Sequence, residues 1–279
     1  MRFGLFLPPF LDFAEPQRVI GLARTAEEAG WDGLFLWDHM LAAPGTPVAD
    51  CWTTMAGIAA VTRRIRIGAL VTPLARRRPW VLARQIVTLD RLSGGRLVAG
   101  AGLGDDGWGE FSSFGEETDP VERARILDEA LDLLQSLLSG DAVRYGGQHY
   151  AVQTSAFQPR PIQNPVPIWA ACRWPNRRPL IRAAGLQGCF PIFPAPVPPP
   201  PPDPADVRAI RQALEDLGVG PGYDLVIRCA LSLADPTTVA DTLGELERAG
   251  ATWMLDSFGP GEPPAAVVEE IVRNGPPRG

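Results

Sequence analysis

A histidine that follows an aspartate at the end of an apolar run is the residue of this sequence best suited to acid–base chemistry. His39 comes directly after Asp38 and the apolar run Gly33–Trp37. Histidine can exchange a proton near neutral pH, which is the property that a general acid or base needs. We therefore predict that His39 is catalytic, although a lone histidine is more often structural.

A second candidate segment is rich in glycine and follows another apolar run. Residues 100–106 read GAGLGDD, so that Gly102 and Gly104 come shortly before Asp105. The string over 102–107 fits G-x-G-x-x-G, but a dinucleotide-binding helix would have to begin at once, and the next clear helix begins at Pro120. We instead predict that these small residues let a flat ligand approach the strand backbone closely.

The basic side chains of this sequence are all arginines. The 26 basic residues include no lysine, which excludes Schiff-base chemistry and a Walker phosphate loop. Cationic contacts to a phosphate or an acidic group must then come from arginine, and Arg76–Arg78, Arg173 and Arg177 are the candidates. For Arg76–Arg78 a solvated loop remains an open alternative.

The composition narrows the remaining classes of function. The chain has 279 residues, a formal charge of −6 and a pI near 5.1, which argues against binding to nucleic acid. Two histidines and four widely separated cysteines predict no metal site. No apolar run is long enough to span a membrane, and Pro8-Pro9 interrupts the N-terminal one. We expect a soluble, cytoplasmic protein.

Strand-like and helix-like segments alternate along the whole chain. Apolar strands are predicted over residues 2–7, 33–37, 65–71, 96–101, 166–170, 188–193, 225–231 and 252–255. Helices are predicted between them, one beginning at Asp119-Pro120, and a small hairpin at 143–152 precedes the fifth strand. Eight such units predict one (β/α)8 TIM barrel domain over residues 1–279. An open doubly wound sheet is the alternative.

A proline-rich segment interrupts this alternation. Nine prolines fall between Pro191 and Pro204, five of them consecutive at Pro198–Pro202. Such a run favours extended geometry and excludes a helix or an inner strand. We predict a long loop after the sixth strand, with a passive spacer favoured over a lid or a partner-binding segment.

Aromatic side chains gather near the predicted strand ends, where the active site of a TIM barrel lies. Flat aromatic rings suit stacking against a ring cofactor or an apolar organic substrate, although most could simply pack the core or its rim. The tryptophans in question are Trp37, Trp52, Trp108, Trp169 and Trp174.

Several of these segments together resemble the luciferase-like oxidoreductase superfamily. The most specific stretch begins TPLARRRP at Thr72, continues as TLDRLSGGRL at Thr88 and ends in GAGLG at Gly100. The Asp38-His39 pair, Glu110-Phe111 and PRPIQNPVPIW at 159–169 are further matches. The resemblance covers most of the chain and is weaker at its two ends.

The resemblance implies a barrel that binds FMN or the deazaflavin coenzyme F420 at the mouth where the strands end. It implies that Asp38 and His39 contact the cofactor, that Asp105 helps proton transfer, and that a non-proline cis peptide at Ala69-Leu70 backs the ring. The family's phosphate loop usually has a Gly-Gly pair, which Ala171-Cys172 replaces here. Barrels of this type often form homodimers.

Three hypotheses follow for the activity. The first is an oxidoreductase that transfers a hydride between F420 and a small organic substrate, with His39 or Asp105 supplying or taking the proton. The second is an FMN-dependent monooxygenase of the same family. The third is a barrel without redox activity, which the missing Gly-Gly pair motivates.

Overall fold

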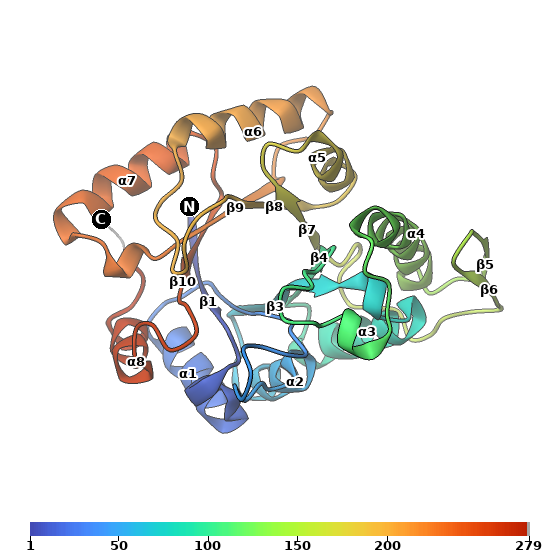
Figure 1. Ribbon diagram of the computed structural model, residues 1–279, viewed down its shortest axis with the longest axis horizontal. Helices are drawn as coiled ribbons and strands as arrows, with labels where there is room; N and C mark the ends of the chain where they lie inside the picture. Colours follow the sequence, from blue (N-terminus) through green and yellow to red (C-terminus); the bar gives the residue numbers. More distant parts are fainter. Residues whose placement is uncertain (278–279) are drawn as a thin grey trace.

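A closed barrel of eight parallel strands forms the centre of the protein, whose computed structural model describes residues 1–277 (Figure 1). Around the barrel the strands follow the order β1-β10-β9-β8-β7-β4-β3-β2. They are β1 (Arg2–Leu7), β2 (Gly33–Leu36), β3 (Arg66–Pro73), β4 (Leu97–Gly102), β7 (Ile168–Arg173), β8 (Gly188–Ile192), β9 (Asp224–Cys229) and β10 (Trp253–Ser257). The predicted (β/α)8 barrel is confirmed, and the open sheet is excluded.

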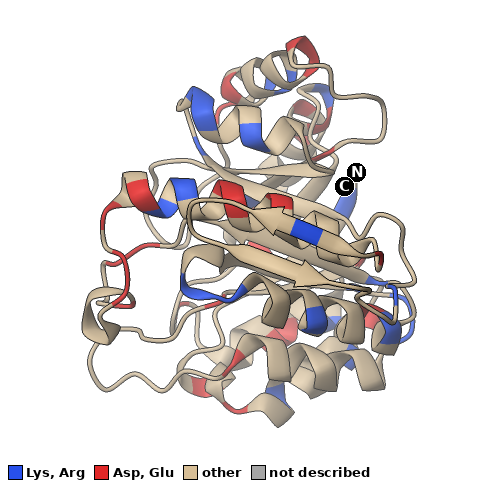
Figure 2. Cartoon of the chain, turned by 90° about the vertical axis from the view of Figure 1, so that its right-hand side faces the viewer, with Lys and Arg blue, Asp and Glu red and all other residues tan. Residues whose placement is uncertain are grey.

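Helices surround the barrel as the alternation predicts (Figure 1). They are α1 (Pro16–Glu28), α2 (Cys51–Val61), α3 (Pro79–Ser93), α4 (Pro120–Leu138), α5 (Arg177–Ala184), α6 (Pro204–Asp216), α7 (Pro236–Arg248) and α8 (Ala265–Asn274). The predicted hairpin is also present, as β5 (Val143–Gly146) and β6 (Ala151–Thr154). It lies outside the ring of helices, on the side that faces the viewer in Figure 2.

Acidic residues directly before prolines determine where several helices begin. Asp119, Asp203 and Asp235 each accept a hydrogen bond from a backbone N–H in the first turn, and Glu15 does the same for α1. The following proline needs no hydrogen-bond partner for its nitrogen and already has a helical φ. The helix start predicted at Asp119-Pro120 is therefore confirmed.

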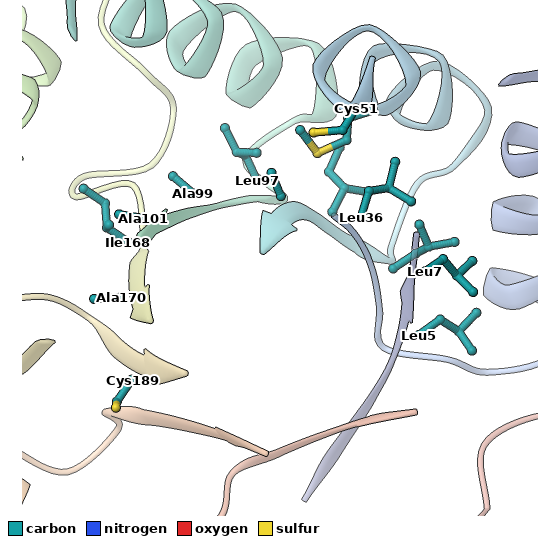
Figure 3. Close-up of a cluster of buried hydrophobic side chains, with 14 of the residues drawn as sticks. Leu5, Leu7, Leu36, Cys51, Leu97, Ala99, Ala101, Ile168, Ala170 and Cys189 are labelled. Atoms are coloured by element: carbon teal, nitrogen blue, oxygen red, sulfur yellow. The ribbon is translucent and has the colours of Figure 1, made fainter. Parts of the chain in front are cut away.

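Apolar side chains fill both sides of the barrel wall. Those that point outward from the strands, such as Leu5, Leu36 and Leu97, pack beneath the helices (Figure 3). Those that point inward form a separate cluster that is mostly aromatic. Its largest members are Phe6, Phe10, Phe35, Trp37, Trp169, Phe190 and Trp253. No helix within residues 1–277 is both long and apolar enough to cross a membrane.

The proline-rich segment packs across the ends of β9 and β10. Its first two residues still belong to β8, where Pro191 pairs in register with Cys172, so the expectation that this segment contains no inner strand is wrong at its start. Pro191 is tolerated because its nitrogen faces β9, and the pairing of β8 with β9 ends at Cys189, so no hydrogen bond of the sheet is lost. Further along, the carbonyl oxygen of Pro199 accepts the N–H of Ala230 at 2.8 Å. A Cβ atom added at Gly259 would lie 3.1 Å from Val197. The segment therefore forms part of the rim of the barrel mouth.

Asp256 is a buried acid at the end of β10, and burial raises its pKa from 3.8 to about 6. Its side chain is 1% exposed, one carboxylate oxygen accepts the N–H of Ser232 at 3.2 Å, and the other has no partner within the described residues. Because the folded state binds this proton more tightly than the unfolded state, stability falls as the pH rises from about 4 to about 6.

We therefore predict that Asp256→Asn raises the free energy of unfolding by up to about 3 kcal/mol at pH 7.5, since each pKa unit is worth about 1.4 kcal/mol. At pH 4 the variant should match the wild type. Urea denaturation at both pH values measures this, with the exposed Asp241→Asn as the control. A variant that is less stable at pH 7.5 would contradict the prediction.

Candidate active site

The inward-facing side chains at the carboxyl ends of the strands form an aromatic mouth. Successive side chains of a strand point to opposite faces of the sheet. A residue two positions after an inward-facing one on the same strand therefore also faces the barrel interior. Trp37 lies 5.6 Å from Phe6 and 5.9 Å from Phe10 between ring centroids, and Phe6 lies 5.6 Å from Phe190. The mouth is therefore walled by flat apolar surfaces.

His39 lies among these rings. Its ring centroid is 5.8 Å from Trp37, 5.6 Å from Phe10 and 5.1 Å from Trp108. Its Nδ1 is 2.6 Å from the Oε2 atom of Glu110, and its side chain is 24% exposed. Nε2 has no hydrogen bond to any of residues 1–277. With Nδ1 held by a carboxylate, Nε2 is the nitrogen that can exchange a proton at the mouth.

Glu110 is the residue that holds His39 in place. Its side chain is 2% exposed, and its Oε1 accepts the N–H of Met40 at 2.5 Å and the Nη1 of Arg76 at 2.9 Å. Burial by itself raises the pKa of Glu110, but the hydrogen bonds from His39 and Met40 and the charge of Arg76 outweigh it, so the pKa lies below 4.5. Glu110 is therefore an ionised carboxylate that fixes the proton of His39 on Nδ1.

Asp38 lies behind His39 in the same charge network. Both of its carboxylate oxygens accept Nη2 of Arg77 at 2.8 Å, and Oδ2 also accepts the indole N–H of Trp52 at 3.2 Å. Arg76 donates to the backbone carbonyl of Asp38 at 2.8 Å. The Asp38 carboxylate, which is 3% exposed, is thus engaged by other side chains, and its predicted contact with a cofactor stays a prediction.

The structure contradicts both interpretations of Arg76 and Arg77. These arginines do not lie in a solvated loop, and they are not available to bind a phosphate, because two buried carboxylates, Asp38 and Glu110, already neutralise their charges. The side chain of Arg76 is only 4% exposed. No local sequence pattern indicates that these arginines pair with Asp38 and Glu110, because the fold alone brings the three segments together.

The glycines at the end of β4 and just after it allow close packing within the barrel wall. A Cβ atom on Gly100 would collide with the backbone oxygen of Ala69, and one on Gly102 with the side chain of Val71. Gly104 has a φ of +74°, and a Cβ there would lie 2.8 Å from Pro73. Close packing therefore requires glycine at these positions, and the prediction that these residues let a flat ligand approach the strand backbone stays a prediction.

Strand β3 carries the irregularity that the resemblance implies, one residue later than expected. The non-proline cis peptide joins Leu70 and Val71, not Ala69 and Leu70, and the register with β4 shifts between Ala69 and Thr72. Leu70 belongs to the inner cluster, whereas the methyl group of Ala69 packs outward beneath the helices. Leu70 can therefore back a ring in the mouth, and Ala69 can do so only through its backbone.

Asp105 is exposed on the loop after β4. Its Oδ2 accepts the N–H of Gly107 at 3.1 Å, which bends the loop back on itself. No hydrogen bond joins Asp105 to His39 among residues 1–277, so a shared role in proton transfer stays a prediction. Between Asp105 and Glu110 the same loop places Trp108 against His39.

The end of β7 and the start of α5 offer a cationic edge to the mouth. Ala171 contacts the inner cluster, and Arg173 and Arg177 are exposed. Asn176 precedes α5 without capping it through its side chain, so the first N–H groups of the helix are open to an anion. Cys172 is buried with its Sγ donating to Pro179 at 3.2 Å, so only its backbone could contact a phosphate. These features fit the phosphate end of a cofactor.

The remaining tryptophans and the cysteines serve packing within the fold. Trp169 fills the barrel interior, and Trp174 donates to Asp206 at 2.9 Å. The four cysteines are free and buried, and no group of three or more His, Cys, Asp or Glu side chains within the described residues could hold a metal ion.

Comparison with known proteins finds relatives over much of the chain. A family model described as luciferase-like monooxygenase matches residues 1–185. An F420-dependent glucose-6-phosphate dehydrogenase of Amycolatopsis mediterranei is 32% identical over 166 residues, which cover 57% of this chain and 49% of that protein. A second enzyme of that name, from Microbacterium testaceum, is 33% identical over 57% of this chain and 48% of its own length. This chain thus matches about half the length of these curated relatives.

Solved structures share the fold over nearly the whole chain. A monooxygenase, RslO1 of Streptomyces bottropensis, aligns with a TM-score of 0.79 at 20% identity and covers 98% of this chain and 97% of its own. The F420-dependent tetrahydromethanopterin reductase of Methanopyrus kandleri aligns with a TM-score of 0.74 at 19% identity over 98% of this chain and 96% of its own. At these identities the likeness shows the fold alone.

Removing the charge of Glu110 tests the buried network. We predict that Glu110→Gln lowers the free energy of unfolding by about 3 kcal/mol at pH 7, because Arg76 and His39 lose a buried carboxylate. The loss should persist above pH 4.5 and shrink as the pH falls below it, since the lowered pKa of Glu110 stabilises the fold only while the carboxylate is ionised.

Denaturation with urea from pH 3 to 7 measures this difference. Glu270→Gln, on the exposed face of α8, is the matched control and should change stability by less than about 0.5 kcal/mol. If Glu110→Gln were no more harmful than the control, the network would not hold the site together.

Proposed function

Because the chain belongs to the luciferase-like monooxygenase family, we propose that it is an oxidoreductase that binds coenzyme F420 at the barrel mouth and transfers a hydride between F420 and a small organic substrate. The curated relatives named above support F420 as the cofactor, over the part of the chain that they match. The observation that carries the proposal is the pair of His39 and Glu110, which are 2.6 Å apart.

The residues around the mouth fit a flat cofactor with an anionic tail. Leu70 on the β3 irregularity and Ala171 on β7 would lie against the ring, and Arg173, Arg177 and the start of α5 would hold the phosphate. The indole N–H of Trp37 is buried without a partner within the described residues, so it can donate to a bound group. When bound, F420 supplies a two-electron centre that gives or takes a hydride.

The chain's own residues supply proton transfer and a dry environment. His39 would hold or release a proton at Nε2, while Glu110 keeps the opposite nitrogen protonated and stabilises the imidazolium that forms. The rings of Phe10, Trp37 and Trp108 around His39 limit its contact with water and so strengthen the electrostatic effect of Glu110. Asp105 remains a second candidate for the proton, because its carboxylate is open to solvent.

An FMN-dependent monooxygenase is the second candidate. The monooxygenase RslO1 has a barrel similar to this one, and Trp108 on the loop after β4 contacts His39, where its flat ring can stack against a flavin. A barrel without redox activity is the third, because the backbone at Ala171-Cys172 lacks the flexibility of a Gly-Gly pair.

We further propose that the enzyme acts in the cytoplasm, without a nucleic-acid partner, and as a homodimer. The formal charge of −6 supports the second of these statements, and Figure 2 shows acidic and basic residues interspersed over the face that it presents. Homodimer formation rests on the resemblance to the family.

Cofactor choice is tested by titrating the purified protein with F420 and with FMN while absorbance, fluorescence and thermal stability are followed. We predict saturable binding of F420 that raises the melting temperature, because a tight ligand stabilises only the folded state. Binding of FMN alone would support the monooxygenase, and binding of neither would support a barrel without redox activity.

The role of His39 is tested in the same preparation with His39→Asn. With glucose 6-phosphate and a panel of small alcohols as substrates, we predict that F420 reduction slows by about 100-fold or more while F420 affinity changes by less than about threefold. His149→Asn is the matched control, because His149 lies before β6 beside Glu122 and Glu129. Equal rates in wild type and His39→Asn would exclude His39 as the proton-exchanging group.

A further inference from the structure

Arg228 is a cation on β9 that faces the barrel interior. Val226, two residues earlier, belongs to the inner cluster, and Arg228 pairs in register with Leu255, which belongs to it as well. Strand alternation therefore points Arg228 inward. Arg228 lies outside residues 1–185, the part of the chain that the family model matches, so the family match assigns it no role.

The stagger of the barrel places Arg228 opposite the β3 irregularity. In a barrel of this kind, each interior layer is built from four alternate strands. The registers put Arg228 of β9 in one layer with Phe6 of β1, Leu70 of β3 and Ala171 of β7. Leu70 and Ala171 are the residues that would lie against the cofactor ring. Arg228 thus stands across the barrel from Leu70 and is separated from Ala171 by strand β8 alone, at the same depth.

The charge of Arg228 is not balanced by the protein. Within residues 1–277 no carboxylate pairs with Arg228, and its guanidinium makes no hydrogen bond there. Burial lowers the pKa of Arg228, and no neighbouring charge opposes this effect. By contrast, Arg76 and Arg77 in the same mouth are each paired with a buried carboxylate. A half-buried cation without a partner is costly unless it is used to bind an anion.

Two further donors without partners occupy the layer next to Arg228. The hydroxyl of Ser257, which is 0% exposed, and the indole N–H of Trp37, which is 9% exposed, find no partner within the described residues. Trp37 belongs to the inner cluster, and Ser257 follows its member Leu255 by two positions. Arg228 and Ser257 face the interior from the neighbouring strands β9 and β10, and Trp37 faces it from the end of β2, so an oxyanion in the mouth can accept from all three.

We propose that Arg228, Ser257 and Trp37 form a subsite for the carboxylate of an apolar, ring-containing substrate, opposite the cofactor. This assignment deepens the proposed oxidoreductase function and takes it as a premise. A single guanidinium matches the single charge of a carboxylate and can bind it through two parallel hydrogen bonds. A phosphate monoester carries close to two charges and would leave one of them unbalanced. The aromatic walls formed by Phe6, Phe190 and Trp37 favour an apolar body.

Three small probes that share a phenyl ring test the subsite. Benzoate, phenyl phosphate and benzyl alcohol are titrated into the protein with and without F420, and binding is followed by calorimetry. We expect benzoate to bind saturably to the wild type, more tightly than either of the other probes. In Arg228→Gln its affinity should fall at least about tenfold, while that of benzyl alcohol changes by less than about twofold.

Two variants and a control keep the test decisive. Ser257→Ala, which removes only a hydroxyl, should weaken benzoate by about threefold even if Arg228→Gln folds poorly. Arg208→Gln, on the exposed face of α6, is the matched control and should bind benzoate as the wild type does. The carboxylate subsite would be overturned by any of three results. These are failure of the wild type to bind benzoate, binding of benzoate by Arg228→Gln as tightly as by the wild type, and tighter binding of phenyl phosphate than of benzoate.

The cofactor titration separates this proposal from the proposed function. Arg228→Gln should bind F420 as the wild type does, and a tenfold loss of F420 affinity would assign Arg228 to the cofactor instead. Benzoate binding that depends on Arg228 in a protein that binds no F420 would support the subsite and contradict the proposed function. Binding of F420 by a protein whose affinity for benzoate does not depend on Arg228 would support the proposed function and contradict the subsite.

Discussion

The buried charge network at the end of β2 is the constraint on which the rest of the site depends. Two arginines and two carboxylates, Arg76, Arg77, Asp38 and Glu110, balance one another where side chains are at most 18% exposed. Such a cluster is stable only when every charge has a partner. It ties the loop after β2 to the loop after β4 and to the turn after β3, so that three segments far apart in the sequence meet at His39.

The network also determines which nitrogen of His39 can react. Glu110 receives hydrogen bonds on both oxygens, one of them from Nδ1 of His39, and this leaves Nε2 facing the aromatic mouth. Across the mouth, Arg228 has no such partner. On one side of the barrel, Arg76 and Arg77 are paired with buried carboxylates and stabilise the fold. On the other side, Arg228 has no carboxylate partner and is the arginine that we propose to bind a ligand.

The sequence predicted the fold far better than the connections within the site. Apolar strands alternating with amphipathic helices predict the barrel, and Asp-Pro pairs predict helix starts, because both signals are local. Glu110 lies 71 positions from His39, and no local pattern indicates their pairing. Arg228 is one arginine in an apolar strand, and its inward direction follows only from the register. The family resemblance supplied the cis peptide to within one position, which pattern alone could not predict.

Glu110 fixes the proton of His39 on Nδ1 and leaves Nε2 free at the barrel mouth. Nitrogen-15 NMR of histidine-labelled protein tests it directly, because the chain has only two histidines and His149→Asn assigns them. We predict that Nδ1 of His39 carries a proton and that the Nε2 resonance shifts when F420 is added, while the signals of His149 stay in place. A ring protonated at Nε2 alone, or resonances that F420 leaves unchanged, would contradict this claim.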